Sequence, residues 1–300
     1  MSGHQRVEKA VLLAGGRGSR LYPLSRVVSK QLLPVHDKPM VYYPLATLIA
    51  AGIREILLIS TPQDRPRFQE LLGDGHQWGI SIEYRLQEEP KGIAHAILLG
   101  EEFIGEDRIA LILGDNLFSG DFGFDQVLVE FNAGAQIFAL SVEDPGQYGV
   151  VELDSRGRPV GLEEKPREQR SCNAVPGLYI YDETVIERAR QLTPSQRGEL
   201  EITDLNRSYL VDGLLQVKQI GGEVTWFDAG SHRSLLEASA FVAAQEAERG
   251  MKIACLEEVA YRAGCIDLGG FQKAVNAIPY SPYREYLEKI LAEELASGGG

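Results

Sequence analysis

The sequence predicts an α/β protein with a doubly wound, mixed but mainly parallel sheet, added β segments and a helical C-terminal region. Two observations carry this prediction. Strand-like and helix-like segments alternate through the first 113 residues, as in parallel βαβ units. The apolar runs at 56–59 and 109–113 are continuous, which is typical of strands covered on both faces. A chain of 300 residues is long enough to bury a full core.

In the first half, apolar runs mark the strands and glycines mark helix ends. Gly52 closes one predicted helix, and Gly73 and Gly75 stop the next, because glycine readily adopts the left-handed conformation found after helices. The predicted strands cover residues 9–13, 55–61, 81–86 and 108–113, and the predicted helices cover 40–51, 65–72 and 93–103.

After residue 134 the pattern changes to short strand-like segments joined by short turns. Predicted strands cover 135–142, 148–153, 160–164 and 177–181, and predicted helices cover 183–192 and 202–211. From about residue 231 the chain is mostly helical, with an apolar stripe that predicts core or subunit contact, formed by Leu235, Ala238, Phe241 and Val242. We expect a core over residues 7–243 and a helical C-terminal region over 244–300 packed on it.

The charge is acidic overall but basic at the start of the chain. The formal net charge is −13, whereas residues 1–30 hold six basic residues and one acid. This balance argues against a nucleic-acid partner and favours a small anion site near the N-terminus. The three cysteines lack paired spacing, and no apolar stretch approaches a membrane span or a signal peptide. We expect a cytoplasmic protein with no membrane partner.

The sharpest local feature is the segment LLAGGRGSRL at 12–21, directly after the first predicted strand. Glycines let backbone N–H groups approach a phosphate closely, and arginine and serine side chains add donors. The segment is not a P-loop, because no lysine follows the glycines. It is not a dinucleotide fingerprint either, because Leu21 stands where the third glycine is required. We favour a phosphate-binding loop over a plain strand–helix turn.

Two aspartates stand at the ends of strand-like segments. Asp115 follows the predicted strand 108–113, and Asp228 follows the apolar residues Trp226 and Phe227. Open α/β sheets bind ligands at the carboxyl ends of their strands, and carboxylate oxygens suit Mg²⁺. Two isolated aspartates make a weak metal signal, and capping of a turn or helix is the alternative.

Two lysines are further candidates for binding phosphate. Lys30 lies among apolar neighbours on the basic stretch, and Lys165 follows Glu164 at the end of a predicted strand. A Glu–Lys pair of this kind suits a sugar hydroxyl and a phosphate together. The alternatives are a solvated surface lysine and a surface ion pair that contributes little stability.

Taken together, these segments resemble the sugar-1-phosphate nucleotidylyltransferase family. The motifs occur in the family's order, span nearly the whole chain and are highly specific as a set. They are LAGGRGSRL (13–21), SKQLLP (29–34), DKPMVYYPL (37–45), STPQD (60–64), LGDN (113–116), YGVVE (148–152), EEKP (163–166), RGELEITD (197–204) and WFD (226–228).

The resemblance implies a Rossmann-like nucleotidyltransferase core and a defined reaction. A nucleoside triphosphate, with dTTP favoured, and a hexose 1-phosphate, foremost glucose 1-phosphate, would give a nucleotide-sugar and pyrophosphate, the first step toward dTDP-rhamnose and other deoxysugars. The sugar phosphate would attack the α-phosphorus in line with the help of Mg²⁺. Its oxygen is already ionised, so no side-chain nucleophile is required. The resemblance also implies a homotetramer.

The resemblance carries roles onto matching residues. Arg20 would lie along the β- and γ-phosphates, Lys30 near the α-phosphate and Lys165 at the sugar phosphate, and Asp115 and Asp228 would hold Mg²⁺. The residues implied for nucleotide binding are Leu13, Gly15, Gly16, Gly18, Ser19, Arg20, Lys30, Gln31, Gln87 and Gly92, of which Gln87 and Gly92 match the base-reading loop. The residues implied for sugar binding are Asn116, Tyr148, Gly149, Glu164, Lys165 and Val175.

The chain departs from the family pattern at four positions. Ser19 stands where threonine is usual, and Arg17 replaces a small residue and would add an outer phosphate contact. His95 and Ala229 stand where glutamine and threonine are frequent. His95 is close to the base-reading loop, which weakens the expected preference for thymine over uracil, although we expect a packing variant there.

Three other functions compete with this interpretation. A uridylyltransferase of the same fold would differ in base preference. A glycosyltransferase that uses a finished nucleotide-sugar usually has Asp-x-Asp, whereas Asp115 is followed by Asn116 and Leu117. A non-catalytic regulator that binds a sugar nucleotide would be favoured by loss of the candidate lysines or aspartates, and all four are present.

Overall fold

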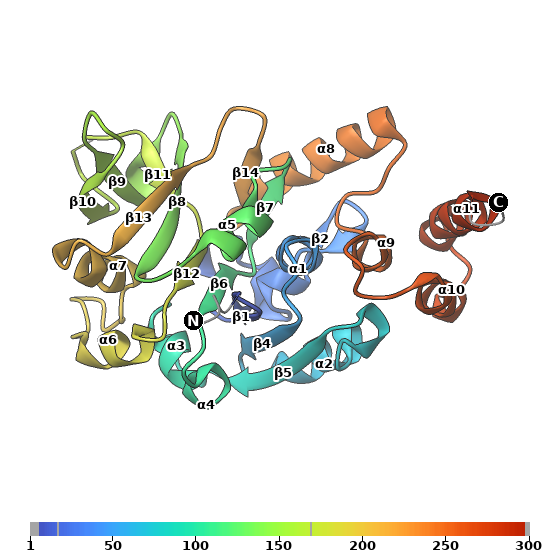
Figure 1. Cartoon of the computed structure of the whole chain (residues 1–300), viewed down its shortest axis with the longest axis horizontal. Helices are drawn as coiled ribbons and strands as arrows, with labels where there is room; N and C mark the ends of the chain where they lie inside the picture. Colours follow the sequence, from blue (N-terminus) through green and yellow to red (C-terminus); the bar gives the residue numbers. More distant parts are fainter. Residues whose placement is uncertain (1–5, 17, 169, 298–300) are drawn as a thin grey trace, which may run out of the picture.

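The computed structural model describes residues 6–16, 18–168 and 170–297, and this part of the chain is built on a ten-stranded mixed sheet (Figure 1). The strand order is β10-β9-β11-β8-β12-β6-β1-β4-β5, with β13 beside β8. The strands are β1 (Lys9–Leu13), β4 (Glu55–Ser60), β5 (Ser81–Leu86), β6 (Ile109–Leu113), β8 (Ala135–Ser141), β9 (Gly149–Leu153), β10 (Pro159–Glu164), β11 (Asn173–Val175), β12 (Leu178–Tyr181) and β13 (Leu215–Gln219). The predicted fold class is confirmed.

The parallel part of the sheet brings several strand ends to one edge. β1 pairs in parallel with β4 and β6, and Leu13 lies opposite both Ile59 and Leu113. β12 then runs antiparallel to β6 and leads into the added β segments. Because parallel strands end at the same edge, the loops after β1, β4 and β6 meet there.

Helices cover both faces of the sheet. The helices of the first 211 residues are α1 (Tyr42–Ala50), α2 (Arg65–Leu72), α3 (His95–Leu99), α4 (Glu101–Ile104), α5 (Phe124–Glu130), α6 (Val185–Gln191) and α7 (Ile202–Val211). The helix predicted over 93–103 is two helices, because the chain breaks at Gly100. A Cβ on Gly100 would lie 3.0 Å from Leu57 Cδ2 of β4, so a larger residue there would have to displace the leucine side chain slightly.

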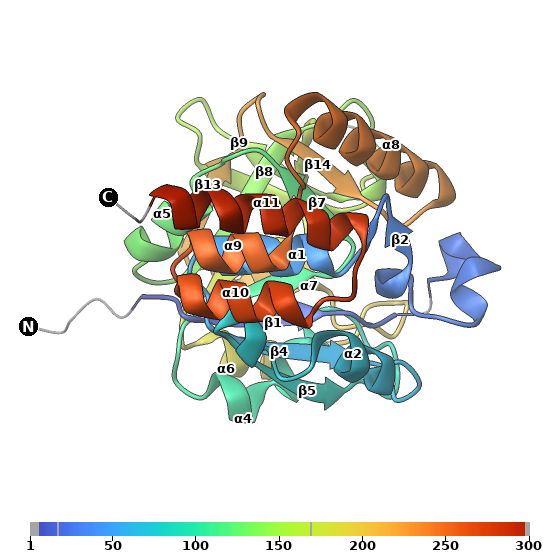
Figure 2. The ribbon, with the colours of Figure 1, turned by 90° about the vertical axis from the view of Figure 1, so that its right-hand side faces the viewer.

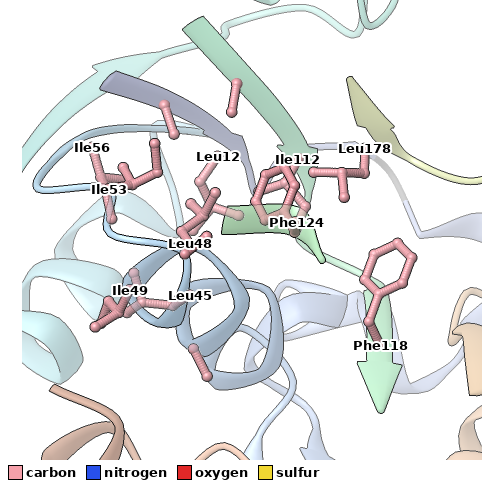
Figure 3. Packing of buried hydrophobic residues seen from close by; sticks show 14 of the residues in the cluster. Leu12, Leu45, Leu48, Ile49, Ile53, Ile56, Ile112, Phe118, Phe124 and Leu178 are labelled. Atoms are coloured by element: carbon pink, nitrogen blue, oxygen red, sulfur yellow. The ribbon is translucent and has the colours of Figure 1, made fainter. Parts of the chain in front are cut away.

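The two cores follow from the alternation of side chains along β1. Leu12 points to one face of the sheet and packs with Leu45 and Leu48 of α1 (Figure 3). Val11 and Leu13 point to the other face, in a cluster that includes residues of α3, α6 and α7. Each fully buried leucine contributes about 1.5–3 kcal/mol relative to an exposed one, so both cores hold the strand ends in place.

The C-terminal helices pack on the α1 side of the sheet. They are α8 (His232–Arg249), α9 (Leu256–Arg262), α10 (Leu268–Ala277) and α11 (Pro282–Ser297), and Figure 2 shows α9, α10 and α11 together in front of α1. The apolar stripe of α8 packs against Val35, Met40 and Leu117, so the predicted core contact is confirmed. The expected boundary between residues 243 and 244 falls inside α8 and stays a prediction.

Two small two-stranded sheets were not predicted. β2 (Pro34–Val35) pairs with β3 (Lys38–Pro39), and β7 (Asn116–Ser119) pairs antiparallel with β14 (Thr225–Asp228). Five 3₁₀ turns of the described chain complete the secondary structure, at Ser19–Leu21, Leu24–Arg26, Lys30–Leu32, His76–Trp78 and Pro145–Gln147. Within the described part of the chain, no cysteine forms a disulfide bond. Among the described helices, none has the length and apolar character that crossing a bilayer requires.

Candidate active site

A cavity of about 310 Å³ opens at the edge where β1, β4 and β6 end. It collects most residues that the sequence analysis singled out: Leu13, Gly15, Gly16, Arg20, Lys30, Gln31, Gln87, Gly92, Asp115, Asn116, Tyr148, Gly149, Glu164, Lys165, Val175 and Asp228. Gly18 and Ser19 are not among the lining residues, and Arg17 lies outside the described residues.

The glycine-rich loop leaves β1 and turns into a 3₁₀ turn that begins at Ser19. Gly16 has a φ of 102°, a left-handed conformation that side chains rarely adopt. Gly18 has a φ of 56°, and its carbonyl accepts a hydrogen bond from Ser25 Oγ at 2.7 Å. The loop therefore exposes backbone at Gly15 and Gly16, while Gly18 and Ser19 hold its far end.

Two cation–carboxylate pairs cross the cavity. The Lys30 ammonium is in direct contact with the Asp115 carboxylate, and the Arg20 guanidinium lies 3.3 Å from Asp228 Oδ2. The pairing of β7 with β14 sets Asp228 opposite Asn116, which brings the two aspartates to neighbouring strand ends. The Ala229 N–H donates to the Asp115 carbonyl at 3.0 Å and fixes this arrangement.

The two carboxyl groups are buried differently and respond in opposite directions. Burial acts to raise the pKa of Asp115, but the Lys30 charge and hydrogen bonds from Lys30 and Asn116 outweigh it and lower the pKa. Burial, and next the neighbouring Asp115 charge, raise the pKa of Asp228, with Arg20 and Lys30 opposing them. Repulsion between two close carboxylates is what a divalent cation between them would relieve.

Asn116 lies between Asp115 and the part of the cavity wall that Trp226 and Tyr148 form. Its Oδ1 accepts hydrogen bonds from the Gly177 N–H at 2.8 Å and from Trp226 Nε1 at 2.7 Å. Its Nδ2 donates to Asp115 Oδ1 at 3.2 Å. The Trp226 ring packs on Tyr148 with centroids 4.9 Å apart, which gives this side an apolar wall.

Glu164 and Lys165 form a second polar group, at the end of β10. Glu164 Oε2 accepts a hydrogen bond from Thr203 Oγ1 at 2.6 Å, and Lys165 Nζ lies 3.7 Å from Glu164 Oε1. Lys165 has a φ of 47°, unusual for a non-glycine residue, and its N–H donates to the Tyr148 carbonyl at 3.0 Å. Backbone strain of this kind clusters at functional sites, where it aims a side chain.

Gln87 and Gly92 also line the cavity, and Gln87 lies beside Gly15 of the glycine-rich loop. Gln87 Nε2 is 3.4 Å from the Gly92 carbonyl and 3.3 Å from His95 Nδ1. Burial, and then the charge of Lys91, lower the pKa of His95, so a neutral ring can accept this proton near pH 7. His95 contacts Gln87 but is not among the lining residues of the cavity, so a packing variant at this position stays a prediction.

Several cavity residues were missed by sequence reasoning. They include Arg197, Glu201, Thr203, Trp226, Tyr179 and Asn206. Arg197 binds the Glu201 carboxylate with both contacts at 2.9 Å and lies 3.9 Å from Glu164. Arg197, Glu201 and Thr203 belong to RGELEITD, one of the motifs that resemble the family. Nothing in the local sequence shows that this segment lies beside β10.

The sequence model of a family described as nucleotidyl transferase matches residues 9–245. The chain belongs to the nucleotidyl transferase family. A Neisseria meningitidis protein named glucose-1-phosphate thymidylyltransferase is 49% identical, across 94% of this chain and 99% of its own. A Mycolicibacterium smegmatis protein of the same name is 50% identical, across 95% of this chain and 100% of its own.

Solved nucleotidyl transferase structures share the fold. A Bacillus anthracis structure, given the name of a glucose-1-phosphate thymidylyltransferase and in complex with sucrose, superposes with a TM-score of 0.73 at 42% identity. It covers 78% of this chain and 94% of that one. A UDP-glucose pyrophosphorylase complexed with UDP-glucose superposes with a TM-score of 0.70 at 25% identity, over 80% of this chain and 99% of that one.

Replacing Gly92 with alanine is expected to weaken nucleotide binding. Gly92 has a φ of +98°, and a Cβ there would lie 2.3 Å from the Leu200 carbonyl oxygen, so the loop must move away from Leu200, which disturbs the contact of the Gly92 carbonyl with Gln87. We expect KM for the triphosphate to rise ~10-fold, equal to about 1.4 kcal/mol, measured by steady-state kinetics. Gly157→Ala is the control, because Gly157 has a φ of +77° with nothing within 4 Å of a Cβ. Equal KM values for the two variants would contradict the steric argument.

Proposed function

We propose that this chain condenses dTTP with α-D-glucose 1-phosphate to give dTDP-glucose and pyrophosphate. The observation that carries the proposal is sequence identity of 46–50% with relatives named glucose-1-phosphate thymidylyltransferase, over at least 94% of this chain. The cavity supports it, because one wall gathers cations, carboxylates and glycine backbone suited to phosphates.

The nucleotide occupies the half of the cavity between the glycine-rich loop and Gln87. Gly15 and Gly16 offer backbone donors to the triphosphate, Gly18 and Ser19 hold the loop from outside the cavity lining, and Arg20 lies along the departing pyrophosphate. Leu13 and Gln31 line the floor, and Gln31 Nε2 is 3.3 Å from the Gly15 carbonyl. The Gln87 amide and the Gly92 backbone read the base, since an amide can both donate and accept at a pyrimidine edge.

The sugar phosphate occupies the other half. Lys165 binds its phosphate and Glu164 accepts hydrogen bonds from its hydroxyls. The remaining contacts come from Asn116, Tyr148, the Gly149 backbone and Val175, all of which line the cavity. A Cβ on Gly149 would lie 3.4 Å from Glu164 Oε2, so a glycine leaves room for a ligand beside that carboxylate.

Asp115 and Asp228 would hold Mg²⁺. Two carboxylates at neighbouring strand ends fit a hard divalent cation. Burial, and next the charge of Asp115, raise the pKa of Asp228, and such an ion would relieve the repulsion between the two carboxylates. When bound, the ion would draw negative charge from the phosphates that meet in the cavity.

The side chains overcome repulsion between two anions. Lys30 and Arg20 already form ion pairs with carboxylate oxygens, and phosphate oxygens are acceptors of the same kind. Lys30 stabilises the charge that develops at the α-phosphorus, and Lys165 orients the attacking oxygen. No side chain needs to remove a proton from the nucleophile, because a phosphate oxygen is already ionised.

The test is pyrophosphate release from pairs of substrates. The pure protein, with Mg²⁺, is given each of four nucleoside triphosphates with glucose, galactose, mannose or N-acetylglucosamine 1-phosphate. We expect the highest kcat/KM with dTTP and glucose 1-phosphate. Equal rates with UTP would favour a uridylyltransferase, for which the His95 contact to Gln87 is the relevant observation. Release from no pair would refute the proposed reaction.

The resemblance also implies an oligomeric state, and the sequence itself predicts a location for the protein. We propose a homotetramer that works in the cytoplasm without nucleic-acid or membrane partners. Light scattering coupled to size-exclusion chromatography would give a mass near four times 33.1 kDa if this is correct.

A further inference from the structure

Asp64 ends the motif STPQD (60–64), to which the proposed function gives no role. The motif follows β4 at the edge of the sheet that carries the cavity, and Asp64 is only 8% exposed. Asp64 stands at the N-cap position of α2, where an aspartate usually accepts a hydrogen bond from the first turn of its helix. Its carboxylate makes no such bond.

The carboxylate of Asp64 instead reaches a distant segment of the chain. Its Oδ1 accepts a hydrogen bond from the backbone N–H of Ser29 at 3.1 Å, and Arg67 donates to the same oxygen at 2.9 Å. Its Oδ2 accepts from Thr61 Oγ1 at 2.9 Å. The loop after β4 is therefore tied to the residue that immediately precedes Lys30.

Hydrogen bonds of Ser29 and Gln31, the two neighbours of Lys30, continue from Asp64 to the glycine-rich loop. Ser29 Oγ donates to Gln31 Oε1 at 2.5 Å, and Gln31 Nε2 is 3.3 Å from the Gly15 carbonyl. The Gln31 carbonyl accepts from the Val41 N–H at 2.9 Å. Ser29 is 7% exposed and Gln31 is 1% exposed, so both neighbours of Lys30 are buried and anchored.

We propose that Asp64 is a positioning residue for Lys30. A lysine side chain has four rotatable bonds, so its ammonium group is aimed only as well as its backbone and partners fix it. The ammonium is in direct contact with Asp115 in the structure. When the ammonium leaves Asp115 and turns to a phosphate, only the backbone of residues 29–31 fixes where the Lys30 side chain starts. Asp64 holds that backbone through the Ser29 N–H. This inference rests on the proposed role of Lys30 in nucleotidyl transfer.

The test is a double-mutant cycle between Asp64 and Lys30, read by pyrophosphate release with dTTP and glucose 1-phosphate. Asp64→Ala is expected to lower kcat ~10-fold and to change KM for dTTP less than ~2-fold, because a displaced cation costs more in the transition state than in binding. In the Lys30→Met background the same change is expected to lower kcat less than ~2-fold, because nothing remains to be positioned. Asp64→Asn keeps an oxygen acceptor for the Ser29 N–H and should recover kcat to within ~3-fold of wild type.

A merely structural role predicts a different pattern. It would give equal kcat losses in both backgrounds, and that result would overturn the proposal. Asp182→Ala is the matched control, because Asp182 is 4% exposed and its carboxylate also accepts from a distant backbone N–H, that of Gly134 at 2.6 Å. It should lower stability with no kcat coupling to Lys30.

A second measurement does not depend on activity. Hydrogen exchange of a peptide covering residues 26–33, which keeps the Ser29 amide after digestion, is expected to speed up at least ~10-fold in Asp64→Ala and to stay unchanged in Asp182→Ala, because Asp64 protects the Ser29 N–H. Unchanged exchange in Asp64→Ala would overturn the proposal even in an active enzyme. Inactivity of the wild type with every substrate pair would refute the proposed function. The exchange experiment needs no activity, so it still tests whether Asp64 holds the backbone at Ser29.

Discussion

Asp115→Ala is expected to lower turnover ~10²–10³-fold at saturating substrates and Mg²⁺, the range found when one preorganised charge partner is removed. Asp115 contacts the Lys30 ammonium and receives a hydrogen bond from Asn116, and we assign it to the proposed cation. Its loss removes a ligand for that cation and a fixed partner for Lys30 in one step. Pyrophosphate release measured as kcat tests this expectation.

Asp107→Ala is the control for this change. Asp107 pairs with Lys9 at 2.7 Å at the opposite end of the parallel sheet, far from the strand ends that form the cavity. It should keep wild-type turnover. Urea denaturation should show little loss of stability in Asp115→Ala, because the Lys30 side chain can turn toward the cavity. Wild-type turnover in Asp115→Ala would remove Asp115 from the proposed metal site.

The positions of the two aspartates show what a sequence can predict here. An apolar run followed by a polar residue identifies a strand end locally, so the placement of Asp115 after β6 was predicted correctly. That Asp228 lies beside it depends on the pairing of β7 with β14, two short strands more than 100 residues apart. β7 is four residues long and follows β6 after two residues, so it is too short to show the alternating pattern that predicts a strand.

The part of the cavity at the end of β10 was also less predictable, because it too depends on segments that are far apart in the sequence. Glu164 and Lys165 were found because they end a strand, whereas Thr203, which hydrogen-bonds Glu164, lies in the first turn of α7. From the sequence alone, a threonine at the start of a helix is explained by its position in that helix and not by a binding site. Only the packing of α7 beside β10 gives it a role at the site, and such packing is a tertiary property.

The helix predicted over 93–103 failed at a single residue. Gly100 ends α3 and begins α4, and its closeness to Leu57 depends on how the helices lie on β4. From sequence alone, an isolated glycine in an apolar helical pattern costs only about 1 kcal/mol and does not require a break. The close packing of Gly100 on Leu57 is a tertiary contact that no local pattern shows.

Lys30→Met is expected to act in opposite directions on catalysis and on metal binding. Methionine keeps the length of the side chain and removes the ammonium. We expect kcat to fall ~10²–10³-fold, with a much smaller change in the dissociation constant for dTTP, because the charge at the α-phosphorus develops in the transition state. A change in KM alone would mean that Lys30 binds only the ground state.

The same substitution frees the Asp115 carboxylate from its cation. In the wild type a divalent ion must compete with the Lys30 ammonium for Asp115 and with the Arg20 guanidinium for Asp228. Lys30→Met removes the first competitor, so the affinity for Mn²⁺ alone should rise ~10-fold, measured by electron paramagnetic resonance without nucleotide. Lys9→Met removes a comparable Lys–Asp pair, with 20% and 34% exposed side chains, at the other end of β1 and should change neither quantity. Unchanged or weaker Mn²⁺ binding in Lys30→Met would show that Asp115 does not exchange its ammonium partner for a metal ion.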